Sequence, residues 1–434
     1  MINIILIYPT QLFDYNKYYK FLIDNNIKTF FILLEDDYFF NKYKYHKLKL
    51  ILHKSTMEYF YNKLINLNND VIYLENKNMY KLNNIIKKLN PNIIKIYDPI
   101  EKDLINNINE YKKYYNLQIL KSPMFLNGSN DNLNIYNQNN FIKHSSFYKL
   151  QRIKYNLLID KNNNPLYNKW SFDIHNRNKF PKDINEDNIM KYKINNNKHV
   201  INAKLYINKF YKNNYGNDEN FIYPITHNES KLWLKNFIKY KLNNFGEYED
   251  GIHSDILIGY HSCLTPILNI GLLTPHDIIN EIKKIKINKN NIYSIEGFIR
   301  QIIGWREYCY FIYDLYGNNL KKKENFYYKD NNNKLTSNIW NGNTNIIYID
   351  NIINKVINYA YCHHIERLMC ISNYFNLLNI NPKEIYKWFM IMFIDAYQVF
   401  MIPNVYGMAL YGYIKDNKHM MMKPYISSSN YILK

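Results

Sequence analysis

The chain has 434 residues, of which 56 are basic and 37 acidic, so its formal net charge at pH 7 is +19. This length accommodates two or three domains with sizeable cores, and a hydrophobic content of 47% excludes a disordered tail protein. Four cysteines are too few for a disulfide scaffold, which favours a reducing compartment. We find neither a signal peptide nor an apolar run long enough to span a bilayer, so we expect a soluble intracellular protein.

The positive charge has two explanations. Lysine and arginine displace counterions from phosphates, so an excess of basic residues favours a nucleic-acid binder. The frequent Asn, Ile, Lys and Tyr residues are also what an AT-rich genome produces, and the excess of lysine then has no function. Charge alone leaves both explanations open.

Residues 1–125 alternate short apolar runs with longer segments of helical spacing. The alternation predicts a doubly wound parallel sheet with helices on both faces, so the first domain is of the α/β class. The first run leads into Pro9-Thr10 instead of a glycine-rich turn, which argues against an ordinary dinucleotide site. The predicted strands are residues 4–8, 29–34, 71–74, 93–97 and 117–120.

The rest of the chain divides into two parts. Asparagine-rich pieces in residues 126–200 predict an inter-domain linker on the surface. Residues 201–434 predict an all-helical domain without convincing strands. The helices that we expect are residues 231–242, 278–285, 294–313, 349–378 and 382–400.

Several groups of residues in the helical part are suited to chemistry. Ser262 and Thr265 precede a helix that begins near Pro266, and such a turn suits a phosphate as well as a simple helix cap. Gln301, Trp305 and Tyr308 are spaced to share a helix face, which is typical of core packing and also of stacking on a flavin or a nucleobase.

A buried arginine needs a partner, and Asp395, which lies inside an apolar run, is the natural partner of Arg367. Such a pair is either structural or flanks a cofactor ring. Cys362, His363, His364 and Cys370 are expected on one helix, where adjacent side chains point about 100° apart. We therefore predict no metal site there and interpret the cysteines as buried structural residues.

Four segments of the helical part resemble the signature motifs of the photolyase/cryptochrome superfamily. They are most similar to the branch of iron–sulfur bacterial cryptochromes and (6-4) photolyases. The resemblance implies an N-terminal α/β antenna domain and a C-terminal all-helical domain that binds FAD. The segments are Gly297–Tyr308, His363–Met369, Asp395–Met408 and Lys423–Ser427, and the resemblance extends upstream through 261–271, 245–250, 170–177 and 122–125 to Gln11-Leu12.

The resemblance also implies roles for individual residues. His363 and His364 are implied to be catalytic, and Trp305 and Arg177 to contact DNA or the extruded lesion. Trp340 and Trp388 are implied to carry electrons to the flavin. The residues implied to bind FAD are Tyr248, Ser262, Leu264, Thr265, Asn269, Gln301, Arg306, His364, Arg367, Asp395, Tyr397, Asn404 and Tyr425.

The chain departs from this branch at three places. Tyr348 replaces the first cysteine ligand of the iron–sulfur cluster and the chain stops before the others, so we predict no cluster. Phe39 and Lys42 occupy positions where the branch binds a lumazine antenna through glutamate and tyrosine, so the antenna is lumazine-type, different or absent. Phe389 replaces a redox-active tyrosine, so we expect photoreduction to run through Trp388 and Trp340 only or to be slow.

The leading hypothesis is a blue-light-driven DNA photolyase that repairs UV-damaged pyrimidine dimers, with (6-4) photoproducts favoured by the paired histidines. The alternatives are a cyclobutane dimer photolyase, a cryptochrome-like photoreceptor without repair, and a DNA-binding protein that has lost FAD. The expected partner is UV-damaged DNA. We expect a monomer that is not associated with a membrane.

Overall fold

The computed structural model describes residues 1–185, 197–322, 332–416, 418–428 and 430–431. The chain divides into two compact units. Unit 1 comprises Met1–Met124, Ile194–Trp233 and Leu264–Thr274, and unit 2 comprises Phe125–Lys193, Leu234–Cys263 and Pro275–Lys434. Both units are discontinuous in sequence, whereas the domains that we expected were continuous.

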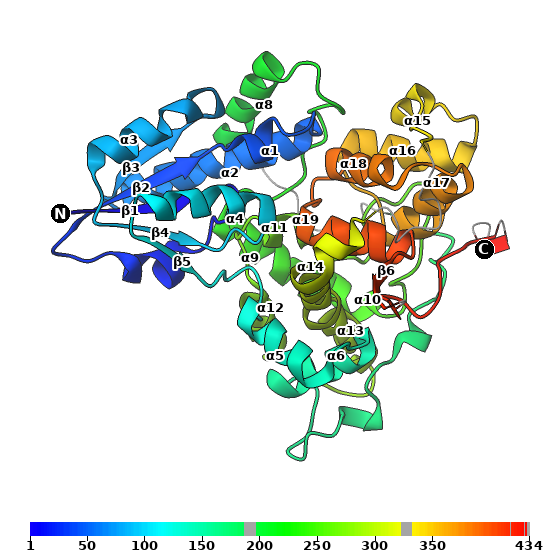
Figure 1. The fold of residues 1–434 in the computed structure, drawn as a ribbon. Coiled ribbons are helices and arrows are strands. Elements are labelled where there is room, and N and C mark those ends of the chain that lie inside the picture. The colour runs from blue at the N-terminus through cyan, green and yellow to red at the C-terminus, as the bar shows by residue number, and fades with distance from the viewer. Residues whose placement is uncertain (186–196, 323–331, 417, 429, 432–434) are drawn as a thin grey trace. The chain divides into compact units, whose positions relative to one another are not determined.

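A five-stranded sheet forms the centre of unit 1 (Figure 1). Its strands run parallel in the order β3-β2-β1-β4-β5, which confirms the predicted doubly wound class. The apolar runs become strands because their β-branched and aromatic residues fit a buried pleated surface. The strands are β1 (Ile2–Ile7), β2 (Lys28–Leu34), β3 (Asp70–Leu74), β4 (Ile93–Tyr97) and β5 (Leu117–Leu120).

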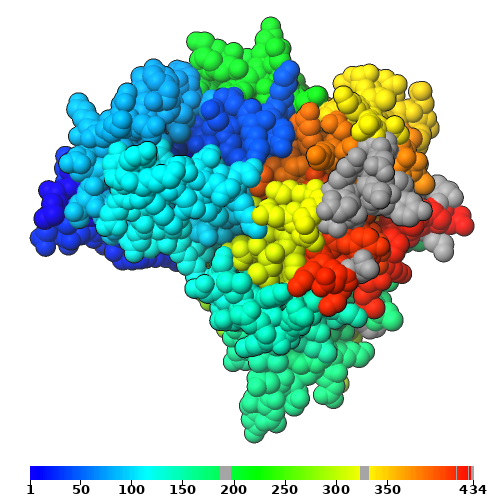
Figure 2. All heavy atoms as spheres, in the orientation of Figure 1, coloured from blue at the N-terminus to red at the C-terminus, as the bar shows by residue number. Residues whose placement is uncertain are grey.

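Helices cover this sheet (Figure 1), and in the space-filling view the cyan atoms of residues near position 100 lie on the face of unit 1 that is in view (Figure 2). Inside unit 1, buried Lys54 of α2 pairs with Glu35 at 2.9 Å and Glu75 at 3.0 Å. The helices with residues in unit 1 are α1 (Asp37–Phe40), α2 (Lys47–Asn66), α3 (Leu82–Leu89), α4 (Lys102–Asn109), α8 (Lys198–Phe210), α9 (His227–Asn236) and α11 (Thr265–Asn269), with shorter turns η1 (Tyr15–Tyr19), η2 (Lys20–Leu22), η3 (Asn76–Lys81) and η4 (Glu110–Lys113).

The turn after α11 fits tightly into unit 1. The main-chain N–H of Leu12 donates to the carbonyl oxygen of Ile270 (2.9 Å). Gly271 has a φ of +89°, and a Cβ atom at this position would lie 2.7 Å from Cδ1 of Phe13. Only glycine therefore combines the left-handed backbone with the close packing.

Unit 2 is mainly helical, as predicted, but it contains more structure than the sequence indicated. The expected linker includes two helices, α5 (Ser129–Asn139) and α6 (His144–Lys154), and α6 buries Phe147 and Tyr148. A small antiparallel pair, β6 (Tyr413–Lys415) and β7 (Lys418–His419), contradicts the expectation that this half has no strands. Both were missed because short or polar segments carry little periodic signal.

Four of the described helical segments of unit 2 are π-helices, namely η7 (Phe237–Lys241), η8 (Arg300–Arg306), η10 (Glu366–Ser372) and η11 (Ile402–Ala409). No described helix of the chain is both long and apolar enough to cross a lipid bilayer. The main helices of unit 2 are α5 (Ser129–Asn139), α6 (His144–Lys154), α10 (Leu242–Phe245), α12 (Pro275–Ile282), α13 (Ile292–Ile299), η8 (Arg300–Arg306), α14 (Glu307–Leu320), α15 (Ser337–Asn341), α16 (Ile347–Tyr359), η10 (Glu366–Ser372), α17 (Asn373–Leu377), α18 (Pro382–Met392), α19 (Gln398–Met401) and η11 (Ile402–Ala409), with shorter turns η5 (Leu166–Asn168), η6 (Asp173–His175) and η7 (Phe237–Lys241).

Two helices that we expected to be continuous are each interrupted, so both predictions were wrong. The segment 349–378 breaks after Tyr359, because Ala360 adopts a left-handed conformation with a φ of +52°, and helix resumes at His364. The segment 382–400 breaks after Met392 and resumes at Gln398. The two breaks meet, since the N–H of Ile394 donates to the carbonyl oxygen of Ala360 (3.0 Å).

Candidate active site

The two helix breaks bring Arg367 and Asp395 together. Nη1 of Arg367 donates to Oδ1 of Asp395 at 2.9 Å, which confirms the predicted ion pair. Nε of Arg367 donates to the carbonyl oxygen of Cys362 (3.0 Å). The guanidinium also lies 4.2 Å from the ring centroid of Phe393. Burial disfavours the charged form of Arg367, but the neighbouring Asp395 carboxylate outweighs this cost, and the pKa of Arg367 is raised.

The restart of the helix at His364 is a capping box. Nδ1 of His363 accepts the N–H of Ile365 (3.2 Å), and the N–H of His363 donates to Oε2 of Glu366 (2.8 Å). Lys355 donates to the other oxygen of Glu366 (2.7 Å). Cys362 and His363 therefore precede the helix instead of lying on it, which corrects our prediction. The sequence signal was Glu366, three residues after the capping residue.

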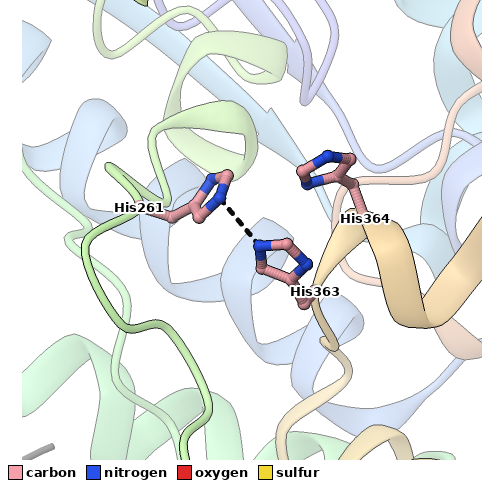
Figure 3. A group of neighbouring side chains, drawn as sticks. All are labelled: His261, His363 and His364. Carbon is pink, nitrogen blue, oxygen red and sulfur yellow. Dashed lines mark hydrogen bonds between the residues drawn. The ribbon is translucent and has the colours of Figure 1, made fainter. Parts of the chain in front are cut away.

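Three histidines of unit 2 meet in front of this helix (Figure 3). Nε2 of His363 lies 2.8 Å from Nε2 of His261, and the two rings are nearly perpendicular. Nε2 of His364 lies 3.2 Å from Oδ1 of Asp250. Burial lowers the pKa of His363 far below its ordinary value and that of His261 to about 3, so both rings are neutral at pH 7. The side chain of His364 is 47% exposed.

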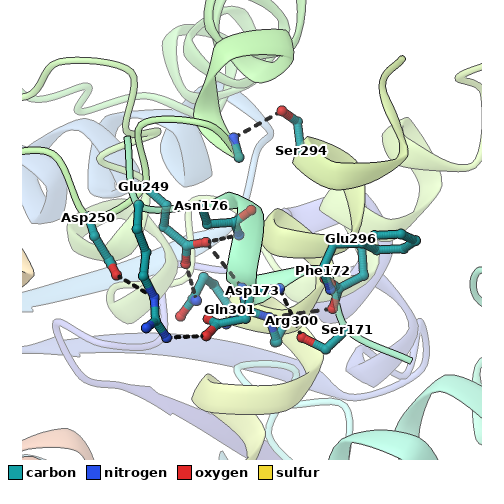
Figure 4. Close-up of polar contacts among 12 residues, drawn as sticks. Ser171, Phe172, Asp173, Asn176, Glu249, Asp250, Ser294, Glu296, Arg300 and Gln301 are labelled. Carbon is teal, nitrogen blue, oxygen red and sulfur yellow. Dashed lines mark hydrogen bonds and ion pairs between the residues drawn. The ribbon is translucent and has the colours of Figure 1, made fainter. Parts of the chain in front are cut away.

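A buried carboxylate, Glu249, joins the neighbouring elements (Figure 4). Its Oε2 accepts from Nδ2 of Asn176 (2.6 Å) and from Nη2 of Arg300 (3.2 Å), and its Oε1 accepts from Gln301. Burial raises the pKa of Glu249, and Arg300 opposes this effect. Gln301, which we predicted as a site residue, thus lies against a charged network.

Arg300 extends this network to two more acidic residues. It lies 3.4 Å from Glu296 and 3.2 Å from Asp173. Asp173 also accepts from Arg177, which is exposed and lies 3.9 Å from Asp250. Sequence reasoning missed Glu249, Arg300 and Asp173 as site residues, although all three lie in segments that carried the resemblance. Nothing in a single sequence indicates that these three segments meet.

The remaining residues predicted to bind FAD lie in different surroundings. Arg306 is buried between the rings of Phe125 and Phe400, at 4.9 and 4.6 Å, and burial lowers its pKa to about 10. Asn404 accepts from Sγ of Cys309 at 3.9 Å. Tyr397 is buried.

Two further predicted residues lie in other parts of unit 2. Tyr425 packs against the cluster of Ile365, Leu368, Met369 and Ala409. Tyr248 stacks on Tyr260, with ring centroids 5.3 Å apart.

The predicted phosphate loop is divided between the units. Ser262 ends a segment of unit 2 near His261, whereas Leu264, Thr265 and Asn269 belong to unit 1. Asn269 is buried in α11, and Thr265 is exposed at its first position. A role for these residues in binding phosphate stays a prediction.

The tryptophans also occupy distinct positions. Trp388 is fully buried, and its ring lies 5.6 Å from that of Phe393, which contacts Arg367. Trp340 lies in α15, which packs on α16. Trp305 is half-buried, with its ring 5.3 Å from His144 and 6.4 Å from Tyr308. Their proposed roles in electron transfer and lesion contact stay predictions.

The two positions implied for the antenna lie in unit 1. Phe39 is buried, and Lys42 pairs with Asp103 and lies 4.3 Å from the ring of Tyr38. The four cysteines are buried and form no disulfide. Burial raises the pKa of Cys309, which therefore stays a thiol. The predictions about the antenna and the iron–sulfur cluster remain predictions.

Comparison with known proteins decides the family. A family model described as deoxyribodipyrimidine photo-lyase-related protein matches residues 5–223, which are 219 of the 434 residues. The chain belongs to this family. This photolyase-related protein is also 33% identical over 288 residues to a (6-4) photolyase from Agrobacterium fabrum. The match covers 66% of this chain and 55% of that relative, so the chain spans little more than half of its length.

Solved structures share the fold of this photolyase-related protein. A cryptochrome from Synechocystis sp. PCC6803 superimposes with a TM-score of 0.66 and 13% identity, over 96% of this chain and 84% of that one. A bacterial class III photolyase from Agrobacterium tumefaciens gives a TM-score of 0.64 and 14% identity, over 93% and 78% of the two chains. These likenesses confirm the photolyase/cryptochrome fold that the sequence motifs indicated.

Proposed function

We propose that this photolyase-related protein is an FAD-dependent, light-driven DNA photolyase that repairs (6-4) photoproducts. The observation that carries the proposal is the pair His363 and His364 beside Asp250, in a chain whose relative is a (6-4) photolyase. His364 is half-exposed and bonded to a carboxylate, which suits a group that passes a proton to a substrate.

The donor groups around Arg367 support a flavin. Arg367 uses Nε and Nη1 on Cys362 and Asp395, and within the described part of the chain its Nη2 group makes no hydrogen bond. A side chain that is 17% exposed thus has donors left for the oxygen and nitrogen acceptors of an isoalloxazine ring. The chemistry that a bound FAD supplies is light-driven electron donation to the damaged bases. Arg367 and Asp395 would orient the ring and place a fixed charge pair beside it.

Damaged DNA is the proposed substrate because unit 2 presents a basic group near the paired histidines and, on helix η8, a half-buried aromatic ring. Arg177 is exposed and lies near Asp250, the partner of His364, so it is available to a backbone phosphate. Trp305 offers a half-buried ring on which an extruded base can stack. The net charge of +19 favours binding to a polyanion such as DNA, whatever the base sequence of that DNA.

The test uses the purified full chain and short duplexes that carry one (6-4) photoproduct or one cyclobutane dimer. Blue-light repair of the first substrate, followed by chromatography, supports the proposal. His364→Ala should retain FAD, seen by absorption, and lose (6-4) repair. The matched control is His253→Ala, which removes an exposed histidine of unit 2 and should leave repair unchanged.

Two other outcomes identify the alternatives. Repair of the cyclobutane dimer alone would identify the protein as a cyclobutane dimer photolyase and contradict the preference for (6-4) photoproducts. A second candidate, a cryptochrome-like photoreceptor, is favoured by the structural likeness to a cryptochrome. A yellow protein that changes its flavin spectrum in light but repairs neither lesion would support that candidate and contradict the repair proposal.

A further inference from the structure

His261 lies in a segment that carried the resemblance but was assigned no role, yet it contacts the paired histidines directly. Its Nε2 lies 2.8 Å from Nε2 of His363 and 2.8 Å from the carbonyl oxygen of Glu249. The ring centroids of His261 and His363 are 4.4 Å apart, and Phe245 closes the other side of His261 at 5.2 Å. Two ring nitrogens, one from His261 and one from His363, therefore meet the carbonyl oxygen of Glu249 at a partly buried position.

The proton positions follow from the helix cap. Nδ1 of His363 accepts the N–H of Ile365, so it carries no proton, and the single proton of the neutral ring is on Nε2. That proton points at Nε2 of His261, which must accept it, and it is shared with the carbonyl oxygen of Glu249, a second hydrogen-bond partner of His363 that only accepts. The proton of His261 is consequently on Nδ1. Without the shared proton, the two acceptors would repel each other at 2.8 Å.

A metal ion is the other group that would satisfy three histidines, whose ligand atoms lie within 4.8 Å of one another. The helix cap formed by His363 argues against a metal ion at this position. A histidine that binds a metal through one nitrogen normally donates a proton from the other. Nδ1 of His363 accepts instead, so a metal on Nε2 would require an imidazolate.

We propose that His261 is a positioning residue of the candidate active site: it accepts the Nε2 proton of His363 and thereby fixes the tautomer and orientation of that ring. His363 is 5% exposed and has its only proton engaged. His364, with its exposed side chain and its bond to Asp250, is left as the histidine that exchanges a proton at the site. The assignment of the reaction rests on the proposed function, whereas the assignment of the tautomers does not.

The experiment measures the tautomers directly in the full chain labelled with ¹⁵N-histidine. Long-range ¹H–¹⁵N correlation spectra distinguish protonated from unprotonated ring nitrogens. We expect His363 to be protonated on Nε2 and His261 on Nδ1. Two variants separate the hydrogen bond from packing. His261→Gln places an amide oxygen where Nε2 was, and His261→Leu removes the acceptor.

His261→Gln should keep the His363 spectrum and repair within about threefold of wild type. His261→Leu should broaden the Nε2 proton signal of His363 through exchange with water and reduce (6-4) repair about tenfold, the effect of one lost hydrogen bond. His253→Leu is the matched control and should change neither.

The outcomes are distinguishable. A wild-type His363 protonated on Nδ1 would overturn the proposal whether or not the protein repairs DNA. Binding of one Zn²⁺ per chain by calorimetry, lost in His261→Leu, would also overturn it and assign a metal site. The expected tautomers in a protein that repairs no lesion would support the role of His261 in holding His363 and contradict only the proposed function.

Discussion

Replacing Asp395 by asparagine tests the electrostatics of the candidate site. The variant keeps the shape of the side chain and removes its charge, so Arg367 becomes a largely buried cation without its counter-ion. Only 17% of the Arg367 side chain and 7% of the Asp395 side chain are exposed. Solvent therefore screens the pair little.

The structure sets the size of the effect. Two unit charges 2.9 Å apart attract by about 6 kcal/mol at an effective dielectric constant of about 20. Removing one partner of a buried pair costs about 3–5 kcal/mol. Arg367 keeps its bond to the Cys362 carbonyl oxygen and its contact with the Phe393 ring, so we expect a loss near the lower value, about 3 kcal/mol.

Urea unfolding followed by circular dichroism at pH 7 measures this loss. The control is Lys284→Met, which removes an exposed pair with Glu281 in unit 2 and should cost less than about 1 kcal/mol. The double variant Arg367→Met with Asp395→Leu should recover most of the stability, because no unpaired charge remains. If Asp395→Asn costs no more than Lys284→Met, the pair is solvated and the reasoning about the site fails.

Three further predictions concern other parts of the molecule. Burial raises the pKa of Glu307 to about 7 from 4.5, so its bound proton stabilises the fold by about 3 kcal/mol below pH ~4.5, and this contribution is lost as the pH rises through 7. Glu307→Gln should abolish that pH dependence in urea titrations, and an unchanged slope would contradict it. Gly271→Ala should lower the free energy of unfolding by about 2 kcal/mol, because its Cβ would contact Phe13 at 2.7 Å with a left-handed backbone; an unchanged unfolding midpoint would show that the turn relaxes freely. Under the proposed function, Trp388→Phe should slow photoreduction of the flavin, measured by its absorbance during illumination, and an unchanged rate would remove Trp388 from the electron path.

The sheet of unit 1 was predictable because its signal is local. Each strand is a run of β-branched and aromatic residues, and the intervening segments have helical spacing, so parallel order follows from alternation alone. The ends of β4 and β5 agree with the predicted bounds. The partner of Arg367 was predictable for a similar reason, since Asp395 lies inside an apolar run and a buried charge needs an opposite one.

The sequence by itself therefore determined the fold class, the family resemblance and the candidate ion pair. It did not determine where the long helices break, because Ala360 and Phe393 are compatible with helix and the hydrogen bond that joins the two breaks links residues far apart in the chain. The meeting of His261 with His363, and of Glu249 with Arg300, likewise depends on segments 102 and 51 residues apart. Hydrogen bonds between such distant segments leave no periodic pattern in the sequence. Only the tertiary packing therefore decided which side chains form the candidate site.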